Sequence, residues 1–217
     1  MNLSPLILFA YRRVPDKTIE SLLLNKLSNK TDIYIISDGY NGDADKNDVL
    51  RVRRYLETIS GFNSIVITEA AENKGLASSV ISGVSEVVAK FGKVIVLEDD
   101  LLVSSNFLDF MNEALNFYKD EQKIWSISGY SPNLPGIEGY KEDVYLSLRG
   151  CSWGWASWEN RWNSIDWEVN DFKRIKNSKE MRKNFELGGN DLFKMLDLQM
   201  LAAIDSWAIR WCFSQFI

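Results

Sequence analysis

Three adjacent carboxylates, Glu98, Asp99 and Asp100, follow directly after the apolar residues 94–97. Like charges this close are unfavourable unless a cation or hydrogen-bond donors offset them. Because the chain contains no histidine, a metal here would have oxygen ligands. Oxygen ligation suits Mg²⁺ or Mn²⁺, which typically take one or two protein carboxylates together with substrate phosphates. The triplet therefore predicts a divalent-metal site, and the alternative is a strand that ends in a solvated acidic turn.

Polar residues follow the other apolar runs of the N-terminal half in the same way. Arg12 and Arg13 come at the end of the first run, and a guanidinium offers paired donors to phosphate oxygens. Asp38 follows the second run and can accept the N3–H of a uracil. Lys74 stands just before a predicted helix, where backbone N–H groups and the helix dipole favour anions such as a nucleotide phosphate. The alternatives are surface cations for the arginines, a plain turn at Asp38 and an ordinary loop at Lys74.

Composition excludes several classes of enzyme and partner. Without histidine, the chain cannot build a Ser-His-Asp or Cys-His arrangement, so carboxylates must carry any proton transfer. Cys151 and Cys212 do not form a CxxC pair, which argues against structural zinc and dithiol redox chemistry and fits a reducing cytosol. The net charge of −5 argues against a nucleic-acid partner. No apolar run reaches the roughly 20 residues that cross a bilayer. We expect no transmembrane segment and a cytoplasmic protein, either free or peripheral at the inner face of the membrane.

The elements that position these residues alternate between strand and helix. Apolar runs of strand length predict four strands, and helical spacing of apolar residues predicts a helix after each of the first three. The predicted strands cover residues 5–11, 32–37, 64–68 and 93–100, and the predicted helices cover residues 16–27, 45–60 and 76–90. Continuously apolar strands with intervening helices indicate an α/β fold, in which a mostly parallel sheet has helices on both faces. Ligands bind beyond the carboxyl ends of such strands, so we expect the polar clusters to project toward one rim.

The second half predicts a different pattern. It has a helix at 106–118, a short strand at 124–130 and a helical run at 192–211, with a tryptophan-rich segment between the last two. Tryptophan faces stack on sugar rings, although large aromatic side chains mostly fill cores. Trp153 and Trp155 flank a glycine, and an extended chain there would place both rings on one side. These two are therefore the candidates for acceptor-side sugar contacts, with core packing as the alternative.

The segment VIVLEDDLLVSSNFLDF resembles the DXD-type segment of GT-A glycosyltransferases. Its EDD form is similar to that of the Golgi N-acetylglucosaminyltransferase that initiates complex N-glycans and of family 2-like bacterial sugar transferases. PLILFAYRR and YIISDG resemble the first two strands of these enzymes, and WSISGYSPN and GCSWGWASWENRW resemble their acceptor-side segments. The resemblance implies one GT-A (Rossmann-like) domain over residues 1–217, with a nucleotide-sugar-binding half at 1–103 and an acceptor-side half at 104–217. Because the chain stops within an aromatic, apolar stretch, we expect a C-terminally truncated domain.

The same resemblance implies a role for each matched residue. Asp100 would be the direct metal ligand, while Glu98 and Asp99 would hydrogen-bond the sugar and the ribose of the donor. Asp38 would accept a hydrogen bond from the base, and Arg13 would contact the diphosphate.

An inverting transferase also needs a general base that removes the proton of the acceptor hydroxyl. Asp205 lies in a segment that resembles the family's Asp-before-Trp segment carrying this base, although Ser206 replaces a second acidic residue. The alternative is a helix-surface or capping aspartate, and Asp166 and Glu168 are possible substitutes. The sequence thus predicts transfer of a sugar from a nucleotide diphosphate donor, most simply a UDP-sugar, to a hydroxyl of a carbohydrate or glycolipid, with Mn²⁺ or Mg²⁺ as cofactor. The resemblance points to surface polysaccharide or lipopolysaccharide synthesis.

Two other functions compete with this prediction. A sugar-nucleotide pyrophosphorylase also combines a parallel sheet with a metal and a nucleotide, but its first loop is usually glycine-rich, and FAYRRVPDK contains no glycine. A non-catalytic carbohydrate-binding module would use the tryptophans, but it leaves the acidic triplet without a role.

Overall fold

The computed structural model describes residues 3–134, 136 and 139–217. The chain divides into two compact units. The first consists of Met1–Gly129 and Trp153–Asn163, and the second of Tyr130–Ser152 and Ser164–Ile217. The first unit contains the whole sheet, because the segment Trp153–Asn163 returns to it.

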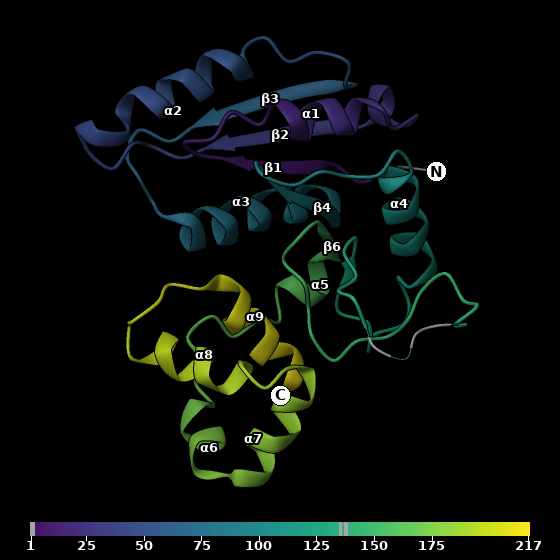
Figure 1. Ribbon diagram of the computed structural model, residues 1–217, viewed down its shortest axis with the longest axis vertical. Coiled ribbons are helices and arrows are strands. Elements are labelled where there is room, and N and C mark those ends of the chain that lie inside the picture. The colour runs from purple at the N-terminus through teal and green to yellow at the C-terminus, as the bar shows by residue number, and fades with distance from the viewer. Residues whose placement is uncertain (1–2, 135, 137–138) are drawn as a thin grey trace. The chain divides into compact units, whose positions relative to one another are not determined.

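A six-stranded sheet forms the centre of the first unit, in the order β3-β2-β1-β4-β6-β5 (Figure 1). Its strands are β1 (Leu6–Ala10), β2 (Asp32–Ser37), β3 (Ser64–Glu69), β4 (Lys93–Glu98), β5 (Ile127–Ser128) and β6 (Trp155–Trp158). The first four strands are parallel, whereas β6 runs antiparallel to both β4 and β5. The α/β fold with a mostly parallel sheet is therefore confirmed. The carboxyl ends of β1, β2 and β4 meet at one edge, where open α/β sheets bind their ligands.

Helices cover both faces of this sheet. Figure 1 shows α1 and α2 on one face and α3 on the other. Alternate residues of β1 serve the two faces: Leu6 and Leu8 join the core cluster that includes α1, while Phe9 lies with Ile36 against Gly83 of α3. Every residue of β1 is consequently buried, as its continuously apolar sequence predicts. The helices of this unit are α1 (Asp16–Leu23), α2 (Asp43–Leu56), α3 (Leu76–Phe91), α4 (Phe107–Phe117) and α5 (Glu159–Trp162), with a 3-10 turn at Ser28–Lys30.

The structure differs from the sequence-based prediction at one helix end and one strand of this unit. The first predicted helix ends at Leu23 instead of residue 27, because the following residues turn into the 3-10 helix before β2. The strand β6 was not predicted, because its tryptophans suggested a sugar-binding loop. All four residues of β6 are buried, including Ser157, so this segment is an interior strand.

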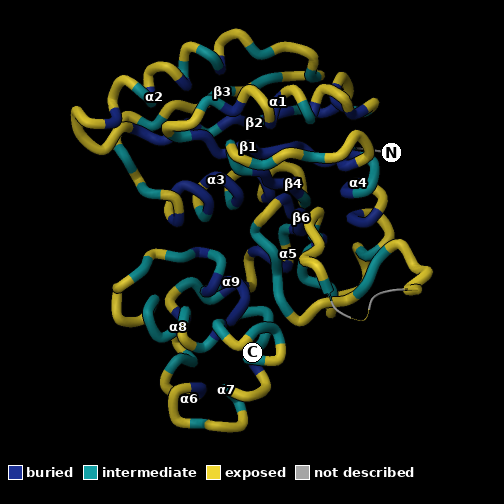
Figure 2. The backbone as a smooth tube through the Cα atoms, viewed as in Figure 1, coloured by how far each residue is buried: buried dark blue, intermediate teal, exposed yellow. Residues whose placement is uncertain are grey.

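The second unit is helical. Its helices are α6 (Phe172–Asn177), α7 (Lys179–Phe185), α8 (Leu192–Met200) and α9 (Trp207–Phe216), with a 3-10 turn at Glu186–Gly188. Ile175, Phe185, Leu196 and Phe213 contribute one side chain per helix to a shared apolar cluster, and Figure 2 shows much of α9 as buried. Arg149 pairs with Asp191 through two hydrogen bonds of 2.6 and 3.0 Å.

The predicted helical run at 192–211 is wrong as a single helix. Ala202 has a φ of 54°, which the α-helix does not allow, and it lies just beyond α8. Ser206 then caps α9, because its Oγ accepts a hydrogen bond from the N–H of Ile209 at 3.3 Å. Within the part of the chain that the structure describes, no helix combines the length and the apolar character that crossing a membrane requires.

Candidate functional site

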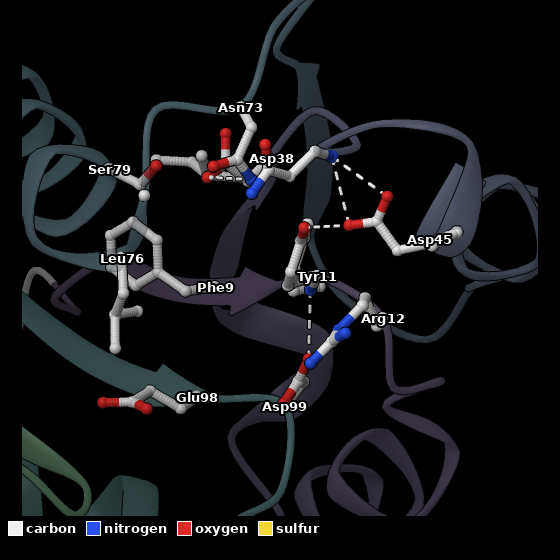
Figure 3. Close-up of a pocket in the computed structure, with 15 residues that line it drawn as sticks. Phe9, Tyr11, Arg12, Asp38, Asp45, Asn73, Leu76, Ser79, Glu98 and Asp99 are labelled. Atoms are coloured by element: carbon white, nitrogen blue, oxygen red, sulfur yellow. Dashed lines mark hydrogen bonds between the residues drawn. The ribbon is translucent and has the colours of Figure 1, made fainter. Parts of the chain in front are cut away.

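A cavity of about 520 Å³ opens beyond the carboxyl ends of β1, β2 and β4 (Figure 3). Its apolar surface comes from Phe9, Ile36 and Leu76. Figure 3 shows two polar ends: Asp38 and Asn73 lie at one of them, and the carboxylates at the end of β4 lie at the other. The convergence of the predicted polar clusters from β1, β2 and β4 follows from the parallel strand order.

The three carboxylates of the acidic triplet point in different directions. Glu98 and Asp99 line the cavity, whereas Asp100 forms an ion pair of 2.7 Å with Arg13, and neither partner of this pair lines the cavity. The Oδ2 of Asp99 accepts a hydrogen bond from the backbone N–H of Tyr11 at 3.0 Å. The strand β4 ends at Glu98, and Asp99 and Asp100 belong to the turn that follows, in which the N–H of Leu101 donates to the carbonyl oxygen of Glu98 at 3.4 Å.

Burial, together with the neighbouring charges of Asp100 and Asp99, raises the pKa of Glu98 to about 7. Burial also raises the pKa of Asp99, although the hydrogen bond from Tyr11 opposes this shift. Glu98 has no hydrogen-bond donor or cation beside it among the described residues. The end of the cavity at β4 therefore contains one carboxyl group, Glu98, without a donor among the described residues, and such a group suits hydroxyl groups or a cation.

The described residues contain no group of three or more histidine, cysteine, aspartate or glutamate side chains that could hold a metal. A Mg²⁺ or Mn²⁺ ion that is shared with substrate phosphates needs only one or two protein carboxylates. Asp100 meets this requirement, because its side chain is 48% exposed and its one partner among the described residues is the exposed guanidinium of Arg13. The donor set therefore fits a divalent ion that arrives with a phosphorylated ligand.

Asp38 is almost fully buried and organises the backbone around it. Its Oδ1 accepts hydrogen bonds from the N–H groups of Gly39 and Lys74, each at 2.9 Å. Its Oδ2 accepts one longer bond of 3.3 Å from Nδ2 of Asn73. Asp38 thus ties the loop before α3 to the end of β2 and still presents Oδ2 to the cavity. The side chain of Lys74 does not line this cavity; it lines a neighbouring hollow.

The loop before α3 approaches so closely that residue 39 must be glycine. A Cβ atom at Gly39 would lie 2.6 Å from the carbonyl oxygen of Glu72 and 2.7 Å from the backbone nitrogen of Asn73. We expect Gly39→Ala to lower the free energy of unfolding by about 1–3 kcal/mol, because backbone atoms must move to admit the methyl group. Urea denaturation measures this change. An unchanged midpoint would show that the loop is not packed as described.

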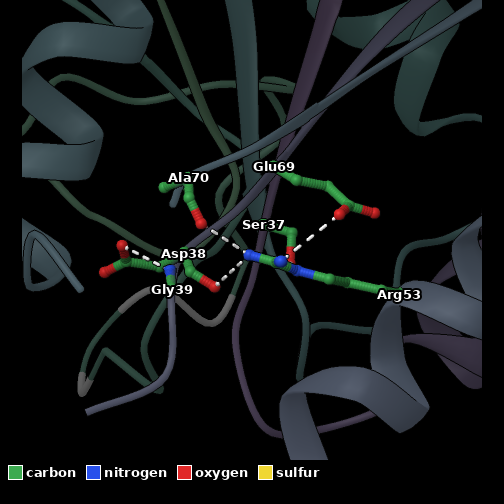
Figure 4. Close-up of polar contacts among 6 residues, drawn as sticks. All are labelled: Ser37, Asp38, Gly39, Arg53, Glu69 and Ala70. Carbon is green, nitrogen blue, oxygen red and sulfur yellow. Dashed lines mark hydrogen bonds and ion pairs between the residues drawn. The ribbon is translucent and has the colours of Figure 1, made fainter. Parts of the chain in front are cut away.

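Arg53 of α2 holds the ends of β2 and β3 together (Figure 4). Its Nη2 donates to the carbonyl oxygens of Ala70 at 2.7 Å and Asp38 at 3.3 Å. Its Nε donates to Oγ of Ser37 at 3.4 Å, and its Nη1 lies 3.3 Å from a carboxylate oxygen of Glu69. Sequence reasoning missed this residue. Arg53 directly follows Val52, a residue of the apolar face of α2, and this position in the sequence could have indicated that its side chain is partly buried.

Tyr11 and Asp45 form a hydrogen-bonded pair that sequence reasoning also missed. The hydroxyl of Tyr11 donates to Oδ2 of Asp45, and the N–H of Asn41 donates to both oxygens of the same carboxylate at 3.0 and 3.1 Å. The hydrogen bond from Tyr11 is the main cause that lowers the pKa of Asp45, and burial is the main cause that raises the pKa of Tyr11. All three residues line the cavity, as does Arg12. The sequence does not predict these hydrogen bonds, because an aspartate in the first turn of a helix is already explained by its favourable interaction with the helix dipole.

The two candidate tryptophans differ in burial. Trp155 is 1% exposed and stacks on Trp162 with ring centroids 5.5 Å apart. The proposed sugar contact at Trp155 is therefore corrected to core packing, because both of its faces are covered. Trp153 is 53% exposed and remains a candidate for the sugar contact.

Asp205 belongs to the second unit, directly before the cap of α9. Its side chain is 66% exposed, and its Oδ1 lies 3.1 Å from Nη2 of Arg210. Asp166 has structural partners instead, because its carboxylate accepts hydrogen bonds from the backbone N–H groups of Glu168 and Asn170. Asp205 is thus the more exposed of these two carboxylates.

The fold is similar to that of solved glycosyltransferases. A mannosyltransferase from Pyrobaculum calidifontis, solved in complex with GDP-Man and Mn²⁺, matches 74% of this chain with a TM-score of 0.52 and 11% sequence identity. The match covers 46% of that enzyme's chain. Glucosyl-3-phosphoglycerate synthase from Mycobacterium tuberculosis, solved with Mn²⁺, UDP-glucose and phosphoglyceric acid, gives a TM-score of 0.40 at 8% identity, over 73% of this chain and 57% of the other. No protein-family model and no curated protein sequence match the chain. The likeness to the mannosyltransferase confirms the GT-A type of α/β fold.

Proposed function

We propose that this chain is the catalytic domain of a metal-dependent glycosyltransferase that moves a sugar from a UDP-sugar to an acceptor hydroxyl. The observation that carries the proposal is the cavity beyond β1, β2 and β4, which combines an apolar surface for a base with acidic side chains at the opposite end. A nucleotide sugar has the same order of parts, with a flat base at one end and a hydroxyl-rich sugar at the other. A surface polysaccharide or lipopolysaccharide is the proposed acceptor.

Each part of the donor has a proposed partner in the first unit. Glu98 and Asp99 accept hydrogen bonds from hydroxyl groups of the sugar and the ribose, which desolvated carboxylates do well. Arg12 lines the cavity, and the exposed guanidinium of Arg13 pairs with Asp100, so both arginines are proposed partners of the diphosphate. Asp100 is the proposed metal ligand. A divalent ion at this position supplies positive charge to the leaving diphosphate.

The proposed reaction is an inverting displacement. The acceptor oxygen bonds to the anomeric carbon as the bond from that carbon to the diphosphate oxygen breaks, and a carboxylate takes the acceptor proton. Asp205 is the proposed base, on the resemblance of its segment and on its exposed carboxylate. Trp153 is the proposed sugar-stacking residue on the acceptor side.

Binding of UDP that depends on Mn²⁺ tests the proposal. We expect isothermal titration calorimetry to detect UDP binding with Mn²⁺, and Asp100→Ala to weaken it by about 10- to 100-fold, because a metal-binding carboxylate is lost. UDP release from UDP-sugars should fall in parallel.

Asp48→Ala is the matched control. Asp48 has the same exposure as Asp100, 47% against 48%, and also pairs with an exposed arginine, Arg51. We expect this variant to bind UDP as the unmodified protein does. A UDP affinity that changes neither with Mn²⁺ nor with Asp100→Ala would contradict the proposal.

A further inference from the structure

The helices α6 and α7 concentrate positive charge in an acidic chain. With the serine between them they cover residues 172–185, which contain six lysine or arginine side chains and one carboxylate, Glu180. This segment therefore has a net charge of +5, whereas the whole chain has a net charge of −5. A charge asymmetry of this kind indicates either a surface for an acidic partner or an ordinary solvated helix face.

Two of the six cations are neutralised locally, and four are not. Arg174 and Lys176 form ion pairs of 3.9 and 3.0 Å with nearby aspartates. The other four cations form no ion pair with the described residues, and they are Lys173, Lys179, Arg182 and Lys183. Lys179 and Lys183 are exposed and four residues apart, so they share one face of α7. Like charges at this spacing repel each other, and an anionic partner offsets the repulsion.

Exposed leucines adjoin these helices. Leu187 follows α7 by two residues and is 67% exposed. Leu146 and Leu148 are 77% and 76% exposed. A Cβ atom at Gly188 would lie 2.8 Å from the carbonyl oxygen of Leu148, so Leu148 and Leu187 are neighbours on the surface of the second unit. Grouped apolar side chains beside a charged surface typically mark a binding surface. Figure 2 shows the turn from α6 to α7 as largely exposed as well.

The leucines distinguish between acidic partners. A nucleic-acid backbone offers phosphates to the lysines but no apolar surface to the leucines. A bilayer with anionic lipids offers both, because the acyl chains lie directly beneath the lipid phosphates. The combination of unpaired lysines and exposed leucines therefore favours a lipid surface.

We propose that α6, α7 and the exposed leucines beside them dock this chain on a membrane surface that contains anionic phospholipids. The lysines contact the lipid phosphates, and the leucines insert at the boundary between the headgroups and the acyl chains. The inference goes beyond the proposed function, because it concerns the second unit alone and requires no nucleotide.

Co-sedimentation with lipid vesicles tests this docking surface. One set of vesicles contains phosphatidylcholine alone, and the other contains equal parts of phosphatidylcholine and phosphatidylglycerol. We expect the unmodified protein to bind only the second set, and to bind it more weakly as the salt concentration rises. The triple variant Lys173→Glu, Lys179→Glu and Lys183→Glu should bind at least about 100-fold more weakly, because three attractive charges become repulsive. The double variant Leu148→Ser and Leu187→Ser should lose about tenfold in affinity, because serine gains nothing from the acyl region.

Lys30→Glu, Lys119→Glu and Lys123→Glu together form the matched control. These three lysines of the first unit are exposed and form no ion pair with the described residues, and their reversal changes the net charge by the same amount. This control should keep its affinity for the anionic vesicles within about threefold, because charges away from the docking surface are screened by salt. Far-UV circular dichroism verifies that each variant is folded.

Equal losses in the two triple variants would overturn the inference, as would an unmodified protein that binds both sets of vesicles equally or neither of them. Displacement from the vesicles by inorganic phosphate at the concentration of the lipid phosphates would identify a simple phosphate site instead. Binding to single-stranded RNA that requires the three lysines, without binding to vesicles, would assign the surface to nucleic acid. UDP binding with Mn²⁺ should be the same in all these variants, so the docking surface and the proposed function can fail separately.

Discussion

Glu98→Gln is expected to stabilise the metal-free protein at pH 8 and to weaken its binding of a nucleotide sugar. Burial and the neighbouring carboxylates raise the pKa of Glu98 to about 7 from its ordinary value of 4.5. Between these two values the folded state holds a proton that the unfolded state has released. The stability from this group is therefore complete below pH 4.5 and is lost as the pH rises through 7, by about 2–3 kcal/mol in total. Glutamine is neutral at every pH and avoids the loss.

Urea denaturation in EDTA at pH 5 and pH 8 measures this effect. The unmodified protein should lose stability between the two values, and Glu98→Gln should lose about 2 kcal/mol less. Glu113→Gln serves as the control, because Glu113 is exposed on α4 and should keep the pH dependence of the unmodified protein. Parallel pH profiles for the unmodified protein and Glu98→Gln would refute the assignment of a buried, uncompensated carboxylate.

The same substitution separates the sugar from the nucleotide. If Glu98 accepts a hydrogen bond from the donor sugar, Glu98→Gln should weaken UDP-sugar binding about tenfold, the loss of one charged hydrogen bond, and change UDP binding much less. A gain in stability with a loss of ligand affinity is the behaviour expected of a functional residue. Equal effects on UDP and UDP-sugar would place Glu98 away from the sugar.

The sequence predicts the sheet of the first unit well and the helical unit less well. Residues 32–37 alone predict β2 with its observed bounds, because an apolar strand between turn residues has few alternatives. The break between α8 and α9 depends on one residue, Ala202, in a conformation that alanine rarely adopts. Alanine favours helices, so the residue type at position 202 does not predict the end of a helix there.

The site is predictable where a residue follows a strand and unpredictable where it depends on partners from other segments. Asp38 and Glu98 could be identified because the carboxyl ends of parallel strands meet at one edge. The pair of Tyr11 and Asp45 depends on a contact between segments far apart in the sequence. At Trp155 the sequence predicts a functional residue where the structure has a core residue, because tryptophan is common both in sugar-binding sites and in protein interiors.

Arg53→Met is expected to lower the stability of the first unit substantially. The Arg53 side chain is 16% exposed, and removal of its guanidinium leaves the carbonyl oxygens of Asp38 and Ala70 without their donor and Glu69 without its cation. Unpaired polar groups at a partly buried site cost about 2–4 kcal/mol in total. Methionine retains the apolar stem of the arginine side chain, so the decrease in the free energy of unfolding measures mainly the lost polar contacts. Urea denaturation measures the difference.

Arg53→Lys and Arg51→Met complete the experiment. Lysine keeps the charge beside Glu69 but cannot reach both carbonyl oxygens with a planar fork, so we expect it to restore only part of the stability. Arg51 is 60% exposed, and its removal should change the free energy of unfolding by less than about 1 kcal/mol. Because Arg53 holds the backbone of Asp38, Arg53→Met should also weaken UDP binding more than pyrophosphate binding. A variant as stable as Arg51→Met would show that β2 and β3 hold the Asp38 loop in place without Arg53.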